Sequence, residues 1–237
     1  MTGTPEKLFA DLLAAAPGRP FVTYYDEASG ERSELSLRSL GNWVAKTHFL
    51  LTDELGLGVG DVALVALPAH WISVAAVLGC LVAGLELAET GGDVAFVAPA
   101  TIALATGAPD VYAIAPSSAA TGFGGQPPDG AADYVSAVRP QADAWASVRF
   151  GADDGDPCLL GRTRHEVVEW ARERAGELGI GPGARVLTTR DWTGTRDLVD
   201  TLFAPLAAGG SVVYVRNCPD EAVLERRVEQ ERASVRL

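Results

Sequence analysis

Apolar and polar positions alternate along this chain in blocks that predict strands and helices in turn. Short apolar runs at Val62–Leu67, Arg185–Thr189 and Ser211–Val215 are typical of buried strands. The longer runs between them, such as Trp71–Val82 and Asp197–Ala208, have the spacing of helices. Because strands alternate with helices, the pattern predicts an α/β fold with mostly parallel sheets flanked by helices.

The N-terminal elements are marked by their end signals. Thr4 followed by Pro5 is a helix start, since threonine caps the first turn and proline fits its first position. Phe21–Tyr25 and Glu31–Ser36 read as a hairpin around a turn-forming segment, and Ser36 can cap the helix that follows. We therefore expect a helix, a hairpin and a second helix before the first parallel strand.

A glycine motif occurs twice and indicates two related halves. Leu-Gly-x-Gly-x-Gly stands at Leu55–Gly60 and again at Leu178–Gly183, each time after a helical stretch and before a strand. The helix after that strand closes on Leu81–Gly84 in the first half and on Leu206–Gly209 in the second. The sequence therefore predicts two related strand–helix lobes.

We place the boundary between the lobes at a polar break. Residues 1–150 form the predicted first lobe, with the N-terminal hairpin and a long Gly- and Pro-rich loop at 116–130. Residues 151–237 form the predicted second lobe, which is shorter.

The position of the glycines argues against a dinucleotide site. In the Rossmann fingerprint the glycines follow a strand and open a helix, so that the helix N-terminus meets the pyrophosphate. Gly56, Gly58 and Gly60 instead follow a helix and open a strand. We interpret both copies as helix ends with tight turns.

Charge and composition exclude several classes of function. The net charge of −12 argues against a nucleic-acid partner, because binding to phosphates needs clustered basic side chains. No His, Asp, Glu or Cys cluster has the spacing of metal ligands, and we expect no metal.

The apolar stretch Val62–Ala88 is interrupted by Pro68, His70 and Glu86, so we expect no membrane span. Cys80, Cys158 and Cys218 lie far apart, which favours reduced thiols in a cytoplasmic protein.

The order of several motifs resembles the AMP-binding, adenylate-forming superfamily, which includes acyl-CoA synthetases and the adenylation domains of peptide synthetases. The motifs of the first half are Arg19–Tyr24, Glu34–Leu40, Leu57–Val62, Leu67–Trp71 and Val82–Gly84, and those of the second are Leu178–Gly183, Val186–Thr189 and Leu202–Val213. The second set is similar to the segment after the family's phosphate loop. The match covers most of this chain but under half of a full-length member. The chain looks similar to a group of short actinobacterial proteins related to AMP-dependent synthetases.

The departures from this family concern the groups that bind ATP. By resemblance the phosphate loop should lie between Ala146 and Thr163, where the family is rich in Ser, Thr and Gly and ends in Pro-Lys-Gly. Here the segment holds Asp153, Asp154 and Asp156 and no lysine, so it would repel phosphate. Ser117–Gly122 is similar to the loop in composition, but it lacks lysine and precedes Pro-rich coil. The chain also stops before the family's Tyr-Gly-x-Thr-Glu motif and the C-terminal domain that carries the catalytic lysine.

These departures predict that the chain alone does not form adenylates, because removing even one transition-state donor typically costs about 10²–10³ in rate. We expect neither catalytic residues nor a bound cofactor, and we interpret the chain as a truncated, degenerate relative of the superfamily.

A ligand pocket is predicted from the ends of two equivalent strands, where open α/β sheets place ligands. His70 and Trp71 follow the first strand, and Asp191, Trp192 and Thr193 follow its counterpart in the second half. The family carries an aromatic or histidine-containing loop along its acyl pocket at the latter point. Trp192 is thus either a pocket wall or a plain loop anchor.

We therefore expect a pseudoenzyme that binds a small acyl-like ligand or a protein partner. Exposed sheet edges and apolar patches would need covering, which predicts a homodimer or a complex with another protein. The alternative is residual adenylate or acyl-CoA binding, with catalysis completed by a partner subunit. A third possibility is a scaffold that binds no small ligand.

Overall fold

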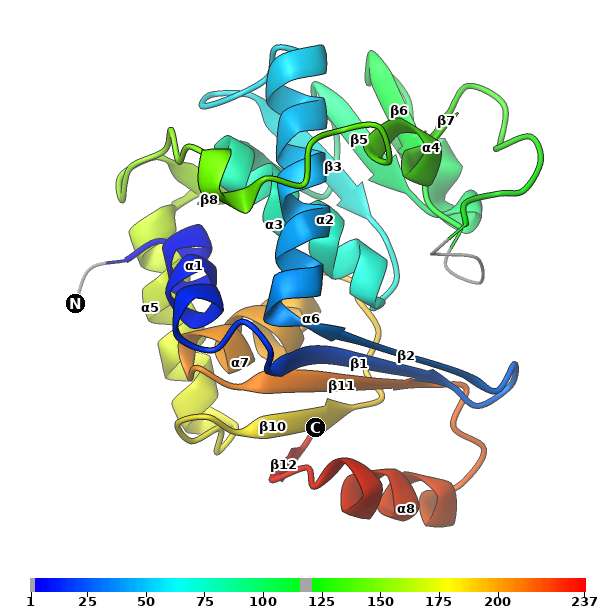
Figure 1. Cartoon of the computed structure of the whole chain (residues 1–237), viewed down its shortest axis with the longest axis vertical. Coiled ribbons are helices and arrows are strands. Elements are labelled where there is room, and N and C mark those ends of the chain that lie inside the picture. Colours follow the sequence, from blue (N-terminus) through cyan, green and yellow to red (C-terminus); the bar gives the residue numbers. More distant parts are fainter. Residues whose placement is uncertain (1–2, 116–120) are drawn as a thin grey trace. The chain divides into compact units, whose positions relative to one another are not determined.

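The computed structural model describes residues 3–115 and 121–237. These residues form two sheets, and they divide into two compact units. Of the described residues, unit 1 contains 3–40, 69–71 and 165–237, and unit 2 contains 41–68, 72–115 and 121–164. Figure 1 shows the elements of both units along the chain.

Unit 1 is built around the five-stranded sheet A, in the order β12-β10-β11-β1-β2. Its elements are α1 (Pro5–Ala15), β1 (Pro20–Asp26), β2 (Glu31–Ser36), α5 (Arg164–Glu177), β10 (Arg185–Thr188), α6 (Thr195–Leu198), the π-helical turn η5 (Val199–Phe203), α7 (Ala204–Ala207), β11 (Ser211–Arg216), α8 (Glu221–Glu231) and β12 (Val235–Arg236). All neighbouring strands are parallel except β1 and β2, which form the predicted antiparallel hairpin.

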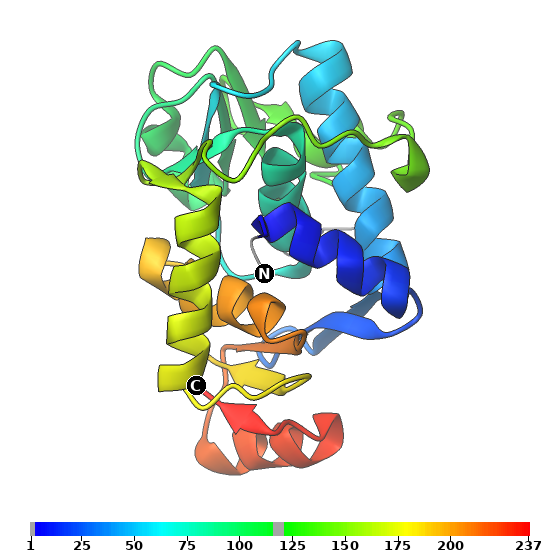
Figure 2. The same cartoon turned by 90° about the vertical axis from the view of Figure 1, so that its left-hand side faces the viewer.

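Helices cover both faces of sheet A, and Figure 2 shows them in side view. On one face, Val213 and Val215 of β11 pack with Leu224 of α8. On the other face, Val186 of β10 packs with Ala204 of α7 and with residues at the end of α5. Burial on both faces explains why the parallel strands read as continuous apolar runs rather than alternating ones.

Unit 2 is built around the seven-stranded sheet B, in the order β7-β6-β5-β3-β4-β8-β9. Its elements are α2 (Leu37–Phe49), the π-helical turn η1 (Leu50–Glu54), β3 (Val62–Ala66), α3 (Trp71–Ala83), β4 (Glu86–Ala88), β5 (Val94–Val97), the 3₁₀ helix η2 (Pro99–Ala105), β6 (Asp110–Ala113), β7 (Ala132–Asp133), α4 (Tyr134–Val138), the 3₁₀ turn η4 (Trp145–Ser147), β8 (Pro157–Leu159) and β9 (Arg162–Thr163). Residues 37–40 of α2 and Trp71 of α3 belong to unit 1, and Arg164, the first residue of α5, belongs to unit 2.

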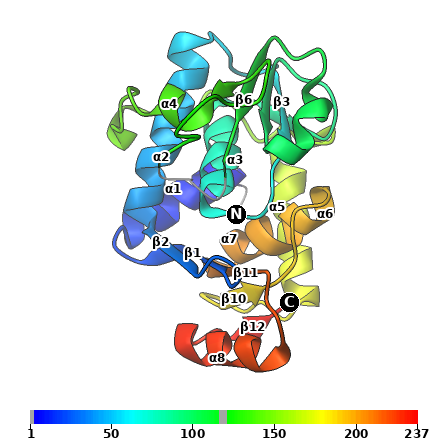
Figure 3. The ribbon, with the colours of Figure 1, turned by 90° about the vertical axis from the view of Figure 1, so that its right-hand side faces the viewer.

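Sheet B is also covered by helices, as Figure 3 shows for α2, α3 and α4. Leu64, Ala95 and Val97 of the sheet pack against Ala105 of η2. Phe96 of β5 contacts the ring of Tyr134 edge-on at a centroid distance of 5.8 Å. The predicted α/β class with parallel sheets flanked by helices is therefore confirmed.

Both glycine motifs lie where the sequence places them, between a helix and a strand. The first follows η1 and opens β3, and the second follows α5 and opens β10. Gly60 and Gly183 have φ of 101° and 72°, a backbone conformation that side chains disfavour. Each motif starts a strand–helix–strand unit with parallel strands, β3–α3–β4 in sheet B and β10 to β11 in sheet A. The internal repeat is therefore structural, and neither copy opens a helix toward a nucleotide.

The two units divide the chain differently from the predicted lobes 1–150 and 151–237. The N-terminal hairpin joins sheet A through β1, which pairs in parallel with β11, 185 residues or more further along the chain. Of the predicted loop at 116–130, residues 116–120 lie outside the described part, and so does most of the Ser117–Gly122 segment. Among the described helices, none is long and apolar enough to span a bilayer.

Candidate functional site

Three parallel strands of sheet A end at one edge and bring polar side chains together there. Asp26 ends β1 and lies opposite Arg216, which ends β11. Asp191 follows the end of β10, the other neighbour of β11. We call Tyr24, Glu31, His70, Asp191 and Arg216 the carboxyl-edge cluster. It lies at the edge where open α/β sheets place their ligands.

Asp191 organises this cluster through three hydrogen bonds. Its Oδ1 accepts the backbone N–H of Ala69 at 2.7 Å and that of Trp192 at 2.9 Å. Its Oδ2 accepts from Nη2 of Arg216 at 2.5 Å. One carboxylate therefore ties segment 69–71 and the loop after β10 to the end of β11. The predicted residues His70 and Asp191, far apart in sequence, belong to the same cluster.

His70 is fully buried in the cluster. Its ring lies edge-on to Tyr24 at a centroid distance of 4.1 Å and tilted against Trp71 at 5.5 Å. Its Nε2 lies 3.7 Å from Oε1 of Glu31. Burial lowers the pKa of His70 more strongly than Glu31 raises it, so the imidazole is neutral at neutral pH. A neutral imidazole has no positive charge with which to attract an anion such as a phosphate.

Trp192 and Thr193 are held by the start of the next helix. The indole Nε1–H of Trp192 donates to Oγ1 of Thr201 at 2.9 Å, and its ring lies edge-on to Tyr214. Oγ1 of the exposed Thr193 donates to Asp197 at 2.7 Å. These contacts fix the loop after β10. Whether Trp192 also lines an acyl pocket stays a prediction.

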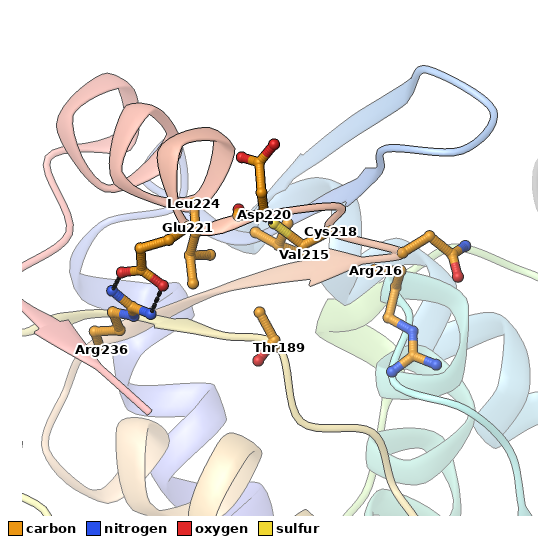
Figure 4. A pocket seen from close by; sticks show the side chains of 9 residues that line it. Thr189, Val215, Arg216, Cys218, Asp220, Glu221, Leu224 and Arg236 are labelled. Carbon is orange, nitrogen blue, oxygen red and sulfur yellow. Dashed lines mark hydrogen bonds and ion pairs between the residues drawn. The ribbon is translucent and has the colours of Figure 1, made fainter.

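A cavity of about 540 Å³ opens beside the cluster, on the side of α8. Figure 4 shows its labelled side chains. It is lined by Thr189, Val215, Arg216, Asn217, Cys218, Asp220, Glu221, Leu224 and Arg236. Arg216 belongs both to this lining and to the carboxyl-edge cluster, whereas none of the five predicted pocket residues is part of the lining.

Sequence reasoning missed Tyr24, Glu31 and Arg216. They join His70 and Asp191 only because the hairpin lies in the same sheet as β10 and β11. A usable signal was present, since Asp26 and Arg216 are the charged residues at the ends of two apolar strands. The parallel pairing that brings them together could not be read from the local pattern.

The segment where the phosphate loop is expected by resemblance contains an acidic turn, which lies in unit 2. The backbone N–H of Asp153 donates to Oδ2 of Asp156 at 2.6 Å, and the N–H of Asp156 donates to the carbonyl of Asp153 at 3.1 Å. The carbonyl of Asp156 accepts from the N–H of Arg164. Phosphate loops use free backbone N–H groups, but here two of them are already occupied.

Two cations of unit 2 have structural roles. Nζ of Lys46 donates to the carbonyls of Arg139 at 3.1 Å and Gln141 at 2.5 Å. The buried guanidinium of Arg164 donates to the carbonyls of Leu81 and Leu85, at the C-terminal end of α3. Lys7, the other lysine of the chain, is exposed on α1 in unit 1. Within residues 3–115 and 121–237, no group of three or more His, Cys, Asp or Glu side chains could hold a metal ion.

Comparison with known proteins finds a similar sequence and many similar folds. No family model matches the chain. A protein of Mycobacterium tuberculosis described as "TIGR03089 family protein" is 37% identical over 231 residues, which cover 94% of this chain and 93% of that protein.

The solved structures with a similar fold include CoA ligases and synthetases. An acetoacetyl-CoA synthetase from Streptomyces lividans superposes with a TM-score of 0.79 at 17% identity, over 99% of this chain and 42% of that one. A benzoate CoA ligase from Burkholderia xenovorans gives 0.73 at 16% identity, over 99% and 50%. An acyl-CoA synthetase from Brucella canis gives 0.71 at 16% identity, over 100% and 47%. The chain thus has the fold of the N-terminal part of adenylate-forming enzymes and spans half of their length or less.

Proposed function

The chain belongs to the TIGR03089 family, and we propose that it uses a ligase framework to bind a small acyl-like ligand or a protein partner without activating it with ATP. The fold shared with acyl-CoA ligases supports the framework. In this proposal the chain is a degenerate relative of those ligases, and the ligand lies at His70, Trp71, Asp191, Trp192 and Thr193. The wide spacing of its three cysteines along the sequence supports a reducing, cytoplasmic setting.

The acidic turn at residues 153–156 is the observation that carries this proposal. In this turn the carboxylate of Asp156 accepts a hydrogen bond from the backbone N–H of Asp153. By resemblance, ligases bind the phosphates of ATP at this position. Asp153, Asp154 and Asp156 add negative charge there, and like charges repel a triphosphate. An ATP site at this position would therefore have to open the turn and overcome the repulsion.

Thermal unfolding in the presence of nucleotides tests the proposal. A ligand that binds only the folded state stabilises it by RT ln(1 + [L]/Kd), about 2.7 kcal/mol at a hundredfold excess over Kd. We expect no rise in Tm with millimolar Mg·ATP or AMP. A full-length acyl-CoA ligase measured alongside should show a rise. A saturable rise for this chain would contradict the proposal and favour residual adenylate binding completed by a partner subunit.

A further inference from the structure

Segment 69–71 is a short part of unit 1 whose chain neighbours on both sides belong to unit 2. Its side chains are buried, since Ala69 and Trp71 are 1% and 4% exposed and His70 is fully enclosed. The backbone N–H of Ala69 donates to Oδ1 of Asp191, in the loop after β10, at 2.7 Å. The segment is therefore held at the carboxyl edge of sheet A by burial and by a hydrogen bond that can be followed at a single amide.

His70 is the side chain of this segment that can gain a charge near neutral pH. Its Nε2 lies 3.7 Å from Oε1 of Glu31, which is beyond hydrogen-bond length. The same Oε1 accepts a hydrogen bond from Oγ of Ser33 at 2.8 Å. The rings of Tyr24 and Trp71 lie against the imidazole at centroid distances of 4.1 Å and 5.5 Å. The neutral imidazole thus packs among aromatic rings, beside a carboxylate that already accepts another hydrogen bond.

The neighbouring titratable and charged groups decide what a protonated His70 would meet. They are Tyr24 and Asp26 on β1, Glu31 on β2, Asp191 after β10 and Arg216 on β11. Asp191 and Arg216 are paired with each other, and Asp26 accepts hydrogen bonds within the hairpin turn. Burial, more than any neighbouring charge, raises the pKa of Tyr24 to about 12, so the phenol is neutral. Glu31 is therefore the carboxylate on which a protonated His70 depends.

Protonation puts a positive charge on a side chain that water does not reach, which costs free energy. Glu31 offsets part of this cost, but burial lowers the pKa of His70 more than Glu31 raises it. Once the segment is released into water, the imidazole has its ordinary pKa of about 6.5. The released form then binds a proton more tightly than the closed form, so acid favours release below about pH 6.5.

We propose that His70 is an acid-sensitive latch: segment 69–71 stays on sheet A while the imidazole is neutral and is released when the imidazole takes up a proton. On release Trp71 leaves its buried position, and the hydrogen bond from Ala69 to Asp191 breaks. The latch rests on contacts within unit 1 and does not depend on the proposed function.

Hydrogen–deuterium exchange of the Ala69 amide tests the proposal, because a hydrogen-bonded amide exchanges when its region opens. We expect its protection factor, corrected for the intrinsic exchange rate, to fall several-fold between pH 7 and pH 5, by up to about tenfold per pH unit. The amide of Ile180, which donates to the carbonyl of Ala175 at 2.8 Å, is the reference in unit 1 and should keep its protection. Protection of Ala69 that stays constant, or that falls together with that of Ile180, would overturn the proposal.

Two substitutions assign the effect to His70. His70→Phe keeps an aromatic ring against Tyr24 and Trp71 but cannot be protonated, so the protection of Ala69 should not change between pH 7 and pH 5. The matched control His48→Phe replaces a buried histidine of unit 2 and should leave the pH dependence at Ala69 intact. PH dependence that persists in His70→Phe, or that is lost in His48→Phe, would contradict the latch.

The variant Glu31→Gln keeps the histidine and tests the latch even if His70→Phe does not fold. Without the carboxylate, the protonated ring loses its support in the closed form, so the pKa of His70 falls further. The loss of protection at Ala69 should then continue to lower pH than in the parent. NMR titration of the His70 ring should give a pKa below about 6.5 in the parent and a lower one in Glu31→Gln. A ring pKa at or above this value in the parent, or an unchanged pKa in Glu31→Gln, would refute the proposal.

Discussion

At the scale of single residues, unit 1 depends on a buried carboxylate that the sequence pattern did not single out. Glu231 ends α8 and is buried. It accepts hydrogen bonds from the hydroxyl of Tyr25, from Arg185, and from Arg32 at 3.1 Å. These partners lie on β1, β10 and β2, so one side chain joins α8 to three strands of sheet A. Burial alone would raise the pKa of Glu231, but these hydrogen bonds outweigh it and the pKa is lowered.

The variant Glu231→Gln should therefore destabilise the protein in a pH-dependent way. A carboxylate whose pKa is lower when folded contributes stability that is present above its unfolded pKa of about 4.3. That contribution is lost as pH falls through the folded pKa, which lies below this value. At pH 7 we expect a loss of about 3–5 kcal/mol, as for other broken buried ion pairs. Urea unfolding at pH 7 and pH 3 measures it.

The loss at pH 3 should be clearly smaller than at pH 7, and the exposed Glu229→Gln should cost little at either pH. Equal losses at both pH values would show that Glu231 acts by packing and not by charge.

The candidate site was predictable from the sequence only in part. His70 and Asp191 follow strands, and the rule that ligands lie at the carboxyl ends of parallel strands was enough to select them. Arg216 also ends a strand, yet nothing local to it indicates that Asp191 is its partner. Tyr24 and Glu31 sit in an ordinary hairpin pattern. Their role follows from strand order, which is a tertiary property.

At the scale of elements, the long periodic segments were predictable and the short ones were not. The helix starts marked by Thr4 and Ser36 are confirmed by hydrogen bonds that backbone N–H groups donate to those side chains. Strands β4, β7, β8 and β9 have only two or three residues. A run of that length is too short for any periodicity to show.

The turn into β11 gives a prediction at this scale. A Cβ added to Gly210 would lie 2.2 Å from the carbonyl oxygen of Ala184, a backbone atom that cannot rotate away. Gly181, in the turn into β10, has no atom within 4 Å of an added Cβ. We expect Gly210→Ala to cost about 2–4 kcal/mol, at or above the usual range for overpacking, and Gly181→Ala to be neutral or slightly stabilising.

Chemical denaturation of the two alanine variants checks this prediction. The slope m should be unchanged in both, so that the midpoint reports stability alone. If both variants were as stable as the parent, the close approach of Gly210 to the carbonyl of Ala184 would be refuted.

At the scale of the whole molecule, sheet A is assembled from the two ends of the sequence. The central strand β11 has β10 on one side and β1 on the other, so residues 151–237 contain only part of the sheet. The apolar pattern revealed the two repeated halves but not that the N-terminal hairpin joins the second of them, since pairing between distant segments leaves no local signal.

Expression of fragments tests this assembly. We expect residues 151–237 alone to lack a cooperative unfolding transition, because β11 would lose β1 and expose a buried edge. Co-expression with residues 1–150 should restore the transition. Circular dichroism during heating measures both. A cooperative transition in the isolated fragment would instead support the predicted lobe boundary.

The central proposal is that this chain, although it has the fold of a ligase, does not activate carboxylic acids, because an acidic turn stands where the phosphate loop is expected by resemblance. Release of pyrophosphate from Mg·ATP in the presence of a panel of carboxylic acids tests it most directly. We predict no release above the rate without protein, under conditions in which a full-length acyl-CoA ligase turns over. Release by the purified chain that depends on any one acid would contradict the claim.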